Sequence, residues 1–222
     1  MKVQHILPED IERTSMNIIS RELCERGIVL PEEHAAVVKR VIHTTADFDF
    51  AQTLCFTPGA VEAGLAALLT GADIVTDTNM AKAGISKPTL AKLGGQVFCF
   101  MADEDVARAA RERGTTRAVV AMEKAVRQYP NAIFAVGNAP TALLRLAELI
   151  KAGLRPALVI GVPVGFVNVV ESKERALAVC LENGVPAILA MGRKGGSTVA
   201  AAIYNAMLCQ IKEYKVQPFS DE

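Results

Sequence analysis

Short apolar segments alternate with longer helical segments along most of this 222-residue chain. Most of the apolar segments have the length of a buried strand and lead directly into a loop rich in glycine or polar residues. This alternation is typical of a mostly parallel sheet with helices on both faces. We therefore predict an α/β protein with three layers, α/β/α, in which residues 1–222 form a single domain. The predicted strands are 74–76, 96–100, 132–136, 157–160 and 187–190.

The composition favours a large core and disfavours two classes of partner. Hydrophobic residues make up 51% of the chain and charged residues 22%, so a substantial core can form. The formal net charge is zero, aromatic residues are 5% and Trp is absent, which disfavours a basic nucleic-acid binder with base-stacking surfaces. No run of about 18 apolar residues predicts a membrane span. We expect no nucleic-acid partner and no membrane association.

Cysteine and histidine usage predicts a cytoplasmic protein without a metal site. The five cysteines are scattered and include no C-x-x-C pair, so we expect small core residues in a reducing compartment. Only three histidines occur, and none belongs to an H-E-x-x-H motif. The N-terminus carries acidic residues early and lacks a continuous apolar run, so no signal peptide is predicted. The tail, residues 217–222, is expected to be frayed.

The loops after the predicted strands are expected to gather at one edge, because ligands of such sheets bind beyond the carboxyl ends of the strands. Asp77 ends a strand there and is either a site residue or an ordinary helix N-cap. Asn138 lies at the start of a helix whose first turn contains Pro140. The four loops are 77–84, 137–141, 161–168 and 192–197.

The last of these loops, residues 192–197 (GRKGGS), is expected to combine free backbone N–H groups, two cations and the start of a helix. Those are the elements of an anion site. It is not a Walker loop, because the lysine precedes the glycine pair, and no G-x-G-x-x-G follows a strand. Glycines for tight turns would also explain it. Arg117, in the first turn of another helix, opposes the helix dipole; it is either held by an anionic partner or an ordinary surface arginine.

One stretch, residues 40–49, places a cation and an imidazole one helical turn apart. Residues 31–43 predict a helix, because apolar residues recur there at helical spacing. If that helix ends near His43, its dipole favours the imidazolium, whereas Arg40 opposes protonation. The imidazole could then donate or accept a proton near neutral pH, and Arg40 could hold an anion. The alternative is a surface histidine at a helix end.

Several motifs in a fixed order extend over the chain from about Ile11 to the final helix. They are residues 40–47 (RVIHTTAD), 77–81 (DTNMA), 116–117 (TR), 137–143 (GNAPTAL), 161–168 (GVPVGFVN), 171–173 (ESK) and 195–197 (GGS). Together they resemble the precorrin-8X methylmutase (cobalt-precorrin-8 methylmutase) family of vitamin B12 biosynthesis. A set of long motifs in one order is far more specific than any single glycine loop.

The resemblance implies an isomerase that needs no cofactor and no metal. Such an enzyme moves a methyl group from C-11 to C-12 of (cobalt-)precorrin-8 by a 1,5-sigmatropic shift. The product is hydrogenobyrinate or its cobalt form, cobyrinate. The implied partner is a corrinoid (tetrapyrrole) substrate with many carboxylates, bound by a homodimer near its subunit interface.

The resemblance also implies roles for individual residues. His43 would be the acid–base residue, either by protonating a macrocycle nitrogen or by stabilising the reactive tautomer. Ser15 and Arg40 match substrate-contacting residues of the family, and Arg117 and Arg193 match further cationic positions. The implied substrate-binding set is completed by Thr44, Asp77, Asn138, Gly195, Gly196 and Ser197.

Other expectations concern the surroundings of the site and the alternatives to it. An apolar floor under the macrocycle would come from Val162, Val164 and Phe166, and Lys194 is expected to be a solvated lysine. Residues 44–47 resemble the anaerobic, cobalt-early branch of the family. A corrinoid carrier that binds the pigment without converting it is the second hypothesis. A phosphate- or nucleotide-binding enzyme is the third, although its sequence fingerprints are missing.

Overall fold

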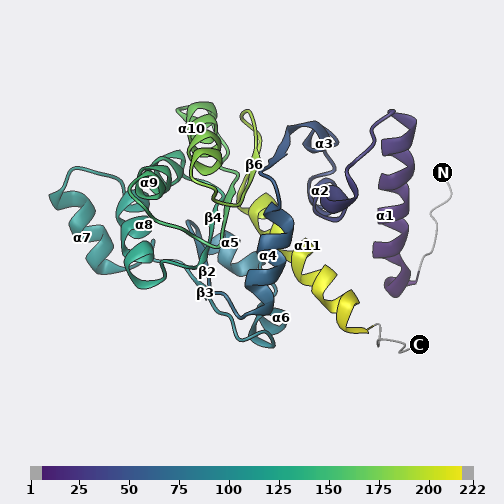
Figure 1. Cartoon of the computed structure of the whole chain (residues 1–222), viewed down its shortest axis with the longest axis horizontal. Coiled ribbons are helices and arrows are strands. Elements are labelled where there is room, and N and C mark those ends of the chain that lie inside the picture. The colour runs from purple at the N-terminus through teal and green to yellow at the C-terminus, as the bar shows by residue number, and fades with distance from the viewer. Residues whose placement is uncertain (1–6, 217–222) are drawn as a thin grey trace.

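The computed structural model describes residues 7–216, and its centre is a six-stranded sheet (Figure 1). The strands are β1 Leu54–Phe56, β2 Ile74–Thr76, β3 Val97–Phe98, β4 Ile133–Val136, β5 Leu158–Gly161 and β6 Ala187–Ala190. Their order in the sheet is β1-β6-β5-β4-β2-β3. The pairing of β1 with β6 is antiparallel and the others are parallel, so the sheet is mostly parallel as predicted.

Helices cover both faces of this sheet (Figure 1). The helices are α1 Pro8–Glu25, α2 Glu32–Thr45, α3 Phe50–Thr53, α4 Ala60–Leu69, α5 Asn79–Gly84, α6 Lys87–Ala91, α7 Glu104–Glu112, α8 Arg117–Gln128, α9 Pro140–Lys151, α10 Val169–Glu182 and α11 Ser197–Val216. Side chains of α2, α4 and α11 form the core on one face, and those of α8, α9 and α10 form the core on the other. The predicted α/β/α layering is therefore confirmed, and α1 lies outside it, beyond α2 (Figure 1).

The strands serve both cores because successive side chains of a strand point to opposite faces. In β4, Ile133 and Ala135 belong to the core that contains α11, whereas Phe134 and Val136 belong to the core that contains α9. All four side chains are fully buried. A strand buried on both faces reads as a continuous apolar run, which is why the sequence predicts the central strands well.

The structure differs from the sequence prediction at several element ends. All five predicted strands occur, with ends shifted by no more than two residues, but β1, which pairs antiparallel with β6, was not predicted. Pro31 is the N-cap of α2 and not its first residue, and the helix ends at Thr45, two residues later than predicted. The tail predicted to be frayed lies outside the described residues.

Two expectations about composition can be compared with the described residues. Among residues 7–216, no helix has both the length and the apolar content needed to cross a bilayer. All five cysteines are free thiols, and Cys180 is buried as predicted. The prediction of a core position is wrong for Cys24, which is exposed on α1.

Candidate functional site

The four predicted loops lie together at the carboxyl edge of the sheet, and two glycines show how closely they approach. A Cβ atom on Gly195 would lie 2.2 Å from the carbonyl oxygen of Val162, and one on Gly137 would lie 2.8 Å from the Cα atom of Ser197. Neither position has room for a side chain. The loops that follow β4, β5 and β6 are therefore packed against one another, and we call this region the loop edge.

Asp77 follows β2 and joins the remaining loop, residues 77–84, to the loop edge. Only 3% of its surface is exposed. Its carboxylate accepts hydrogen bonds from the backbone N–H groups of Gly137 (2.8 Å), Asn138 (2.8 Å) and Ala139 (2.7 Å). Burial raises the pKa of Asp77, and the three N–H donors oppose that rise. Asp77 thus orders the loop before α9, with its carboxylate turned to the backbone, and the side chain of Asn138 is exposed on that loop.

Lys173 supports the loop edge from α10, and sequence reasoning assigned it no role. Its side chain is fully buried, and its Nζ atom donates to the carbonyl oxygens of Gly192 and Lys194, both at 2.8 Å. Burial lowers the pKa of Lys173 to about 8. Its place in the helix is the signal that could have found it, because it shares a helical face with the buried residues Val169 and Ala176.

The glycine-rich turn before α11 is tied to its neighbours by its own polar groups. The N–H of Gly196 donates to the carbonyl of Val162 at 2.8 Å, and the hydroxyl of Ser197 shares a 2.7 Å hydrogen bond with Thr78. We expected free N–H groups along this turn, and for Gly196 that expectation is wrong. The turn still places the N-terminus of the 20-residue helix α11 at the loop edge.

The two cations of this loop differ in their surroundings. The Nζ atom of Lys194 lies 2.6 Å from Asp47 and 2.7 Å from Asp49; the side chain is exposed, as expected for a solvated lysine, but its two ion pairs were not predicted. These hydrogen bonds raise the pKa of Lys194 and lower that of Asp47. Arg193 is exposed, and its guanidinium lies 5.4 Å from the centre of the Phe166 ring. Within residues 7–216 Arg193 makes no ion pair, which leaves its charge available to an anion.

Apolar side chains stand out from the same edge. Phe166 is 83% exposed, Val167 78% and Val164 44%. Val162, which we expected in an apolar floor, is fully buried, because its side chain belongs to the core around α11. The exposed apolar surface at this edge therefore consists of Val164, Phe166 and Val167, and it lies beside the cation Arg193.

Arg117 lies at the start of α8, near the start of α9. The hydroxyl of Thr116 caps α8 by accepting from the N–H of Val119 at 3.3 Å, and it also lies 3.1 Å from the hydroxyl of Thr141 in α9. Arg117 is exposed, and no ion pair involves it in the described part of the chain. The structure thus places the first turn of α8, with Arg117, beside the first turn of α9, which follows the loop after β4.

His43 lies in the last turn of α2 and is exposed. It lines a hollow of about 210 Å³ together with Ser15 of α1 and with Ala46 and Phe48, which follow α2. The Ser15 hydroxyl donates to the carbonyl of Ile11 at 2.9 Å, as polar helix residues often do. The structure therefore brings the predicted acid–base residue and the predicted serine together.

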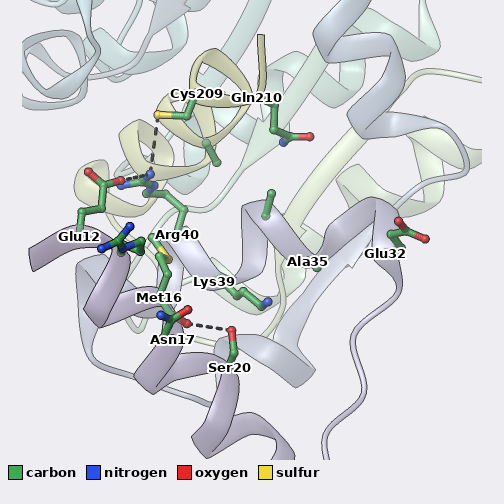
Figure 2. A pocket seen from close by; sticks show the side chains of 13 residues that line it. Glu12, Met16, Asn17, Ser20, Glu32, Ala35, Lys39, Arg40, Cys209 and Gln210 are labelled. Carbon is green, nitrogen blue, oxygen red and sulfur yellow. Dashed lines mark hydrogen bonds and ion pairs between the residues drawn. The ribbon is translucent and has the colours of Figure 1, made fainter. Parts of the chain in front are cut away.

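Arg40 faces a different hollow from His43, a cavity of about 700 Å³ between α1, α2 and α11. Figure 2 shows its guanidinium directed toward Glu12, at 2.5 Å, and toward the Sγ atom of Cys209, at 3.7 Å. Thr44, on the next turn of α2, is exposed and donates its hydroxyl to the Arg40 carbonyl at 3.0 Å. We expected Arg40 to hold an anion beside the imidazole. In this structure its guanidinium forms an ion pair with the carboxylate of Glu12 instead.

These features define a class of protein. A parallel α/β sheet carries, at its carboxyl edge, ordered loops with exposed apolar and cationic side chains, and a helix end with an accessible imidazole lies beside one of them. This is the arrangement of an enzyme for an anionic, partly apolar small molecule. Among residues 7–216, no three His, Cys, Asp or Glu side chains are grouped as metal ligands.

Comparisons with known proteins identify the family. The family model described as precorrin-8X methylmutase matches residues 10–210. The cobalt-precorrin-8 methylmutase of Salmonella typhimurium is 46% identical over 210 residues, which is 93% of this chain and 97% of the relative. That of Priestia megaterium is 42% identical over 203 residues, 91% of this chain and 88% of the relative. The crystal structure of precorrin-8X methylmutase from Thermus thermophilus has a TM-score of 0.81, with 41% identity, and covers 93% of this chain and 100% of that one.

The chain therefore belongs to the precorrin-8X methylmutase family. It is an enzyme of the isomerase class, an intramolecular methyltransferase of cobalamin biosynthesis. The family, the fold class and the type of reaction predicted from the sequence are thus confirmed.

Proposed function

We propose that this enzyme converts precorrin-8, or cobalt-precorrin-8, to hydrogenobyrinate or cobyrinate by moving the methyl group from C-11 to C-12. The observation that carries the assignment of the site is the shared hollow of His43 and Ser15, at a helix end tied to the loop edge through Asp47 and Lys194. The substrate then lies with its carboxylates toward the loop-edge cations Arg193 and Arg117. Its apolar face lies on the exposed side chains of Val164, Phe166 and Val167.

The proposed chemistry asks little of the protein beyond orientation and one proton. The methyl group leaves C-11 as its new bond to C-12 forms, so electrons are redistributed within the macrocycle and nothing is oxidised or reduced. His43 donates a proton to a macrocycle nitrogen and recovers it afterwards, because substrate and product are isomers. No cofactor is required by this balance. Holding the macrocycle in one tautomer and one orientation supplies the rest of the rate.

The other predicted residues divide into those that contact substrate and those that shape the site. Arg117, Asn138, Arg193 and Thr44 are exposed and are proposed to contact substrate directly. The proposed effect of Asp77 is indirect, through the loop it orders. Gly195 and Gly196 form the turn before α11, and Ser197 is the first residue of that helix. Arg40 binds a substrate carboxylate if α1 moves and releases it from Glu12.

We further propose that the enzyme acts as a homodimer in the cytoplasm on the cobalt-containing substrate. The unpaired thiols suit a reducing compartment. The exposed apolar side chains of Ile11 and Ile18 on α1, and of Leu7 at its N-cap, suit an interface. The relatives from Salmonella typhimurium and Priestia megaterium carry the name cobalt-precorrin-8 methylmutase, whereas the Thermus thermophilus structure carries the name precorrin-8X methylmutase. Sedimentation equilibrium tests the dimer, and parallel assays with cobalt-loaded and metal-free substrate test the metal preference.

The assignment is tested by absorbance spectra of the enzyme mixed with precorrin-8 and, separately, with cobalt-precorrin-8, each generated in situ. Wild type is expected to produce the product chromophore, whereas His43→Ala is expected to bind the pigment and convert it at least about a hundredfold more slowly. His34→Ala is the matched control, because His34 lies in the first turn of the same helix and stacks on Phe56 at 3.9 Å. Equal conversion by wild type and His43→Ala would remove His43 from the chemistry. Binding without conversion by wild type would indicate a carrier.

A further inference from the structure

A continuous series of hydrogen bonds connects the end of α2 to the segment that follows it. The hydroxyl of Thr45 donates to the carbonyl of Val41 at 2.8 Å and accepts from the N–H of Asp47 at 3.2 Å. The carboxylate of Asp47 in turn accepts from the N–H of Asp49 at 3.0 Å. Asp47 is therefore fixed relative to the helix turn that carries His43.

Lys194 continues this series into the loop edge from the opposite direction. Its ammonium group bonds the carboxylates of Asp47 and Asp49, at 2.6 Å and 2.7 Å. Its own carbonyl oxygen is held at 2.8 Å by the buried ammonium of Lys173, which also holds Gly192. Lys194 is thus restrained at both its main chain and its side chain, and it links two parts of the site that are about 150 residues apart in the sequence.

We propose that Lys194 is a positioning residue of the methyl-transfer reaction: it fixes His43 relative to the substrate-binding residues of the loop edge. The proposal rests on the proposed function, because it assumes that His43 delivers a proton to a macrocycle held by that edge. Lys194 does not itself bind a substrate carboxylate, since its ammonium group is already paired with the carboxylates of Asp47 and Asp49. The free cation of the loop is its neighbour Arg193.

The exposure of the ion pairs separates this role from a stabilising one. The side chains of Lys194, Asp47 and Asp49 are 48%, 29% and 69% exposed, and pairs so accessible to water contribute little to folding. The segment after α2 also has an independent anchor, because the N–H of Met191 donates to the carbonyl of Thr53 at 2.7 Å. Loss of the Lys194 pairs should leave the fold intact, yet a shift of about 1 Å at a reacting group can cost about a hundredfold in rate.

The test is the single-turnover rate at saturating substrate, measured with the pigment affinity and the melting temperature. Lys194→Met and Asp47→Asn are each expected to slow conversion by about tenfold or more and to change affinity by less than about threefold. The double variant is expected to be no slower than Lys194→Met alone, because the two side chains act through one link. Asp49→Asn is expected to have a smaller effect, because Asp49 lacks the bond to Thr45.

Lys124→Met is the matched control. Lys124 also bridges two aspartates, Asp103 at 2.7 Å and Asp105 at 2.8 Å, but it does so on α8, with partners that follow β3, the outermost strand at the end of the strand order away from β1 and β6. This variant is expected to convert substrate at the wild-type rate. Wild-type conversion by Lys194→Met would overturn the proposal, and so would equal slowing by the two lysine variants or multiplied effects in the double variant.

Hydrogen exchange keeps the proposal testable apart from the proposed function. If wild type itself converts neither precorrin-8 nor cobalt-precorrin-8, the proposed function fails, but the link can still be measured from the backbone amides. Lys194→Met is expected to speed exchange in residues 44–49 and 192–197 together, and Lys124→Met is expected to leave both segments unchanged. Exchange in these two segments that is unaltered by Lys194→Met would show that Lys194 positions nothing.

Discussion

The loop edge and the flank formed by α1 and α2 hold their charged groups in opposite ways. At the loop edge, Asp77 and Lys173 are buried, and backbone groups satisfy each charge. On the flank, the pair between Arg40 and Glu12 is between side chains, and the Glu12 side chain is 59% exposed. The two buried charges of the loop edge are therefore fixed before substrate arrives, whereas the flank pair has one exposed partner, Glu12, and one mostly buried partner, Arg40.

This difference suggests how the enzyme accommodates a large, many-charged macrocycle. Preorganised donors act without reorganisation at the moment of reaction, so a rigid loop edge suits the fixed substrate contacts. The flank instead contains the 700 Å³ cavity, and α1 lies beyond α2 on the side away from the sheet (Figure 1). Ile19 and Leu23 anchor α1 to the core around α2, whereas Glu12 and Arg40 line the cavity. Three substitutions would sharpen or break this comparison.

Replacing the buried anion should have the largest effect. Asp77→Asn keeps the shape of the side chain but leaves fewer acceptors for the three N–H donors, one of which would meet an amide NH₂. We expect a loss of about 3 kcal/mol in the free energy of unfolding, measured in urea. Asp73→Asn is the control on the same strand segment, because Asp73 accepts a single backbone bond, from Gln96 at 2.9 Å. Equal losses in the free energy of unfolding from both variants would show that Asp77 stabilises the protein no more than an aspartate with a single backbone hydrogen bond.

Replacing the buried cation should change how stability depends on pH. Burial lowers the pKa of Lys173 to about 8, from an ordinary value of 10.5 for the unfolded chain, so the unfolded chain binds more protons between these pH values. Wild-type stability should therefore rise relative to Lys173→Met as pH increases from about 8 to about 10.5, by up to about 3 kcal/mol. Urea unfolding of both proteins across this range measures the difference. A constant difference would mean that Lys173 titrates normally and is not desolvated.

The flank ion pair should matter least to stability. Glu12→Gln is expected to lower the free energy of unfolding by about 0.5 kcal/mol, because the pair is partly exposed and screened by salt. The same change frees Arg40 and should leave substrate affinity equal to, or higher than, that of wild type. Urea unfolding and pigment titration measure the two effects. A loss above about 2 kcal/mol would show that the flank is as firmly built as the loop edge.

The sequence predicted the parts of the structure that depend on local pattern. The apolar runs gave the central strands, and the glycine-rich loops after them were correctly placed at one edge. The hydrogen bonds of Lys173 and the ion pairs of Lys194 were not predicted, because the partners of each residue lie on other elements and no spacing in the sequence indicates them. The same reason explains β1, a three-residue strand that exists only through its pairing with β6.

The prediction for the site was uneven for a related reason. His43 and Ser15 were matched to one site by resemblance, and the structure brings them together. Arg40 lies only three residues from His43, yet its guanidinium lines a different cavity, because neighbours on a helix can point to different sides of a packed partner helix. Spacing along a helix thus located the residues but not the direction of a long side chain.

A crystal structure of the enzyme with its corrinoid product would test the central claim most directly. We predict that the macrocycle lies between the His43 imidazole and the loop edge, with a ring nitrogen facing His43 and a peripheral carboxylate on Arg193. A macrocycle bound in the cavity between α1, α2 and α11, out of reach of both His43 and Arg193, would contradict the account.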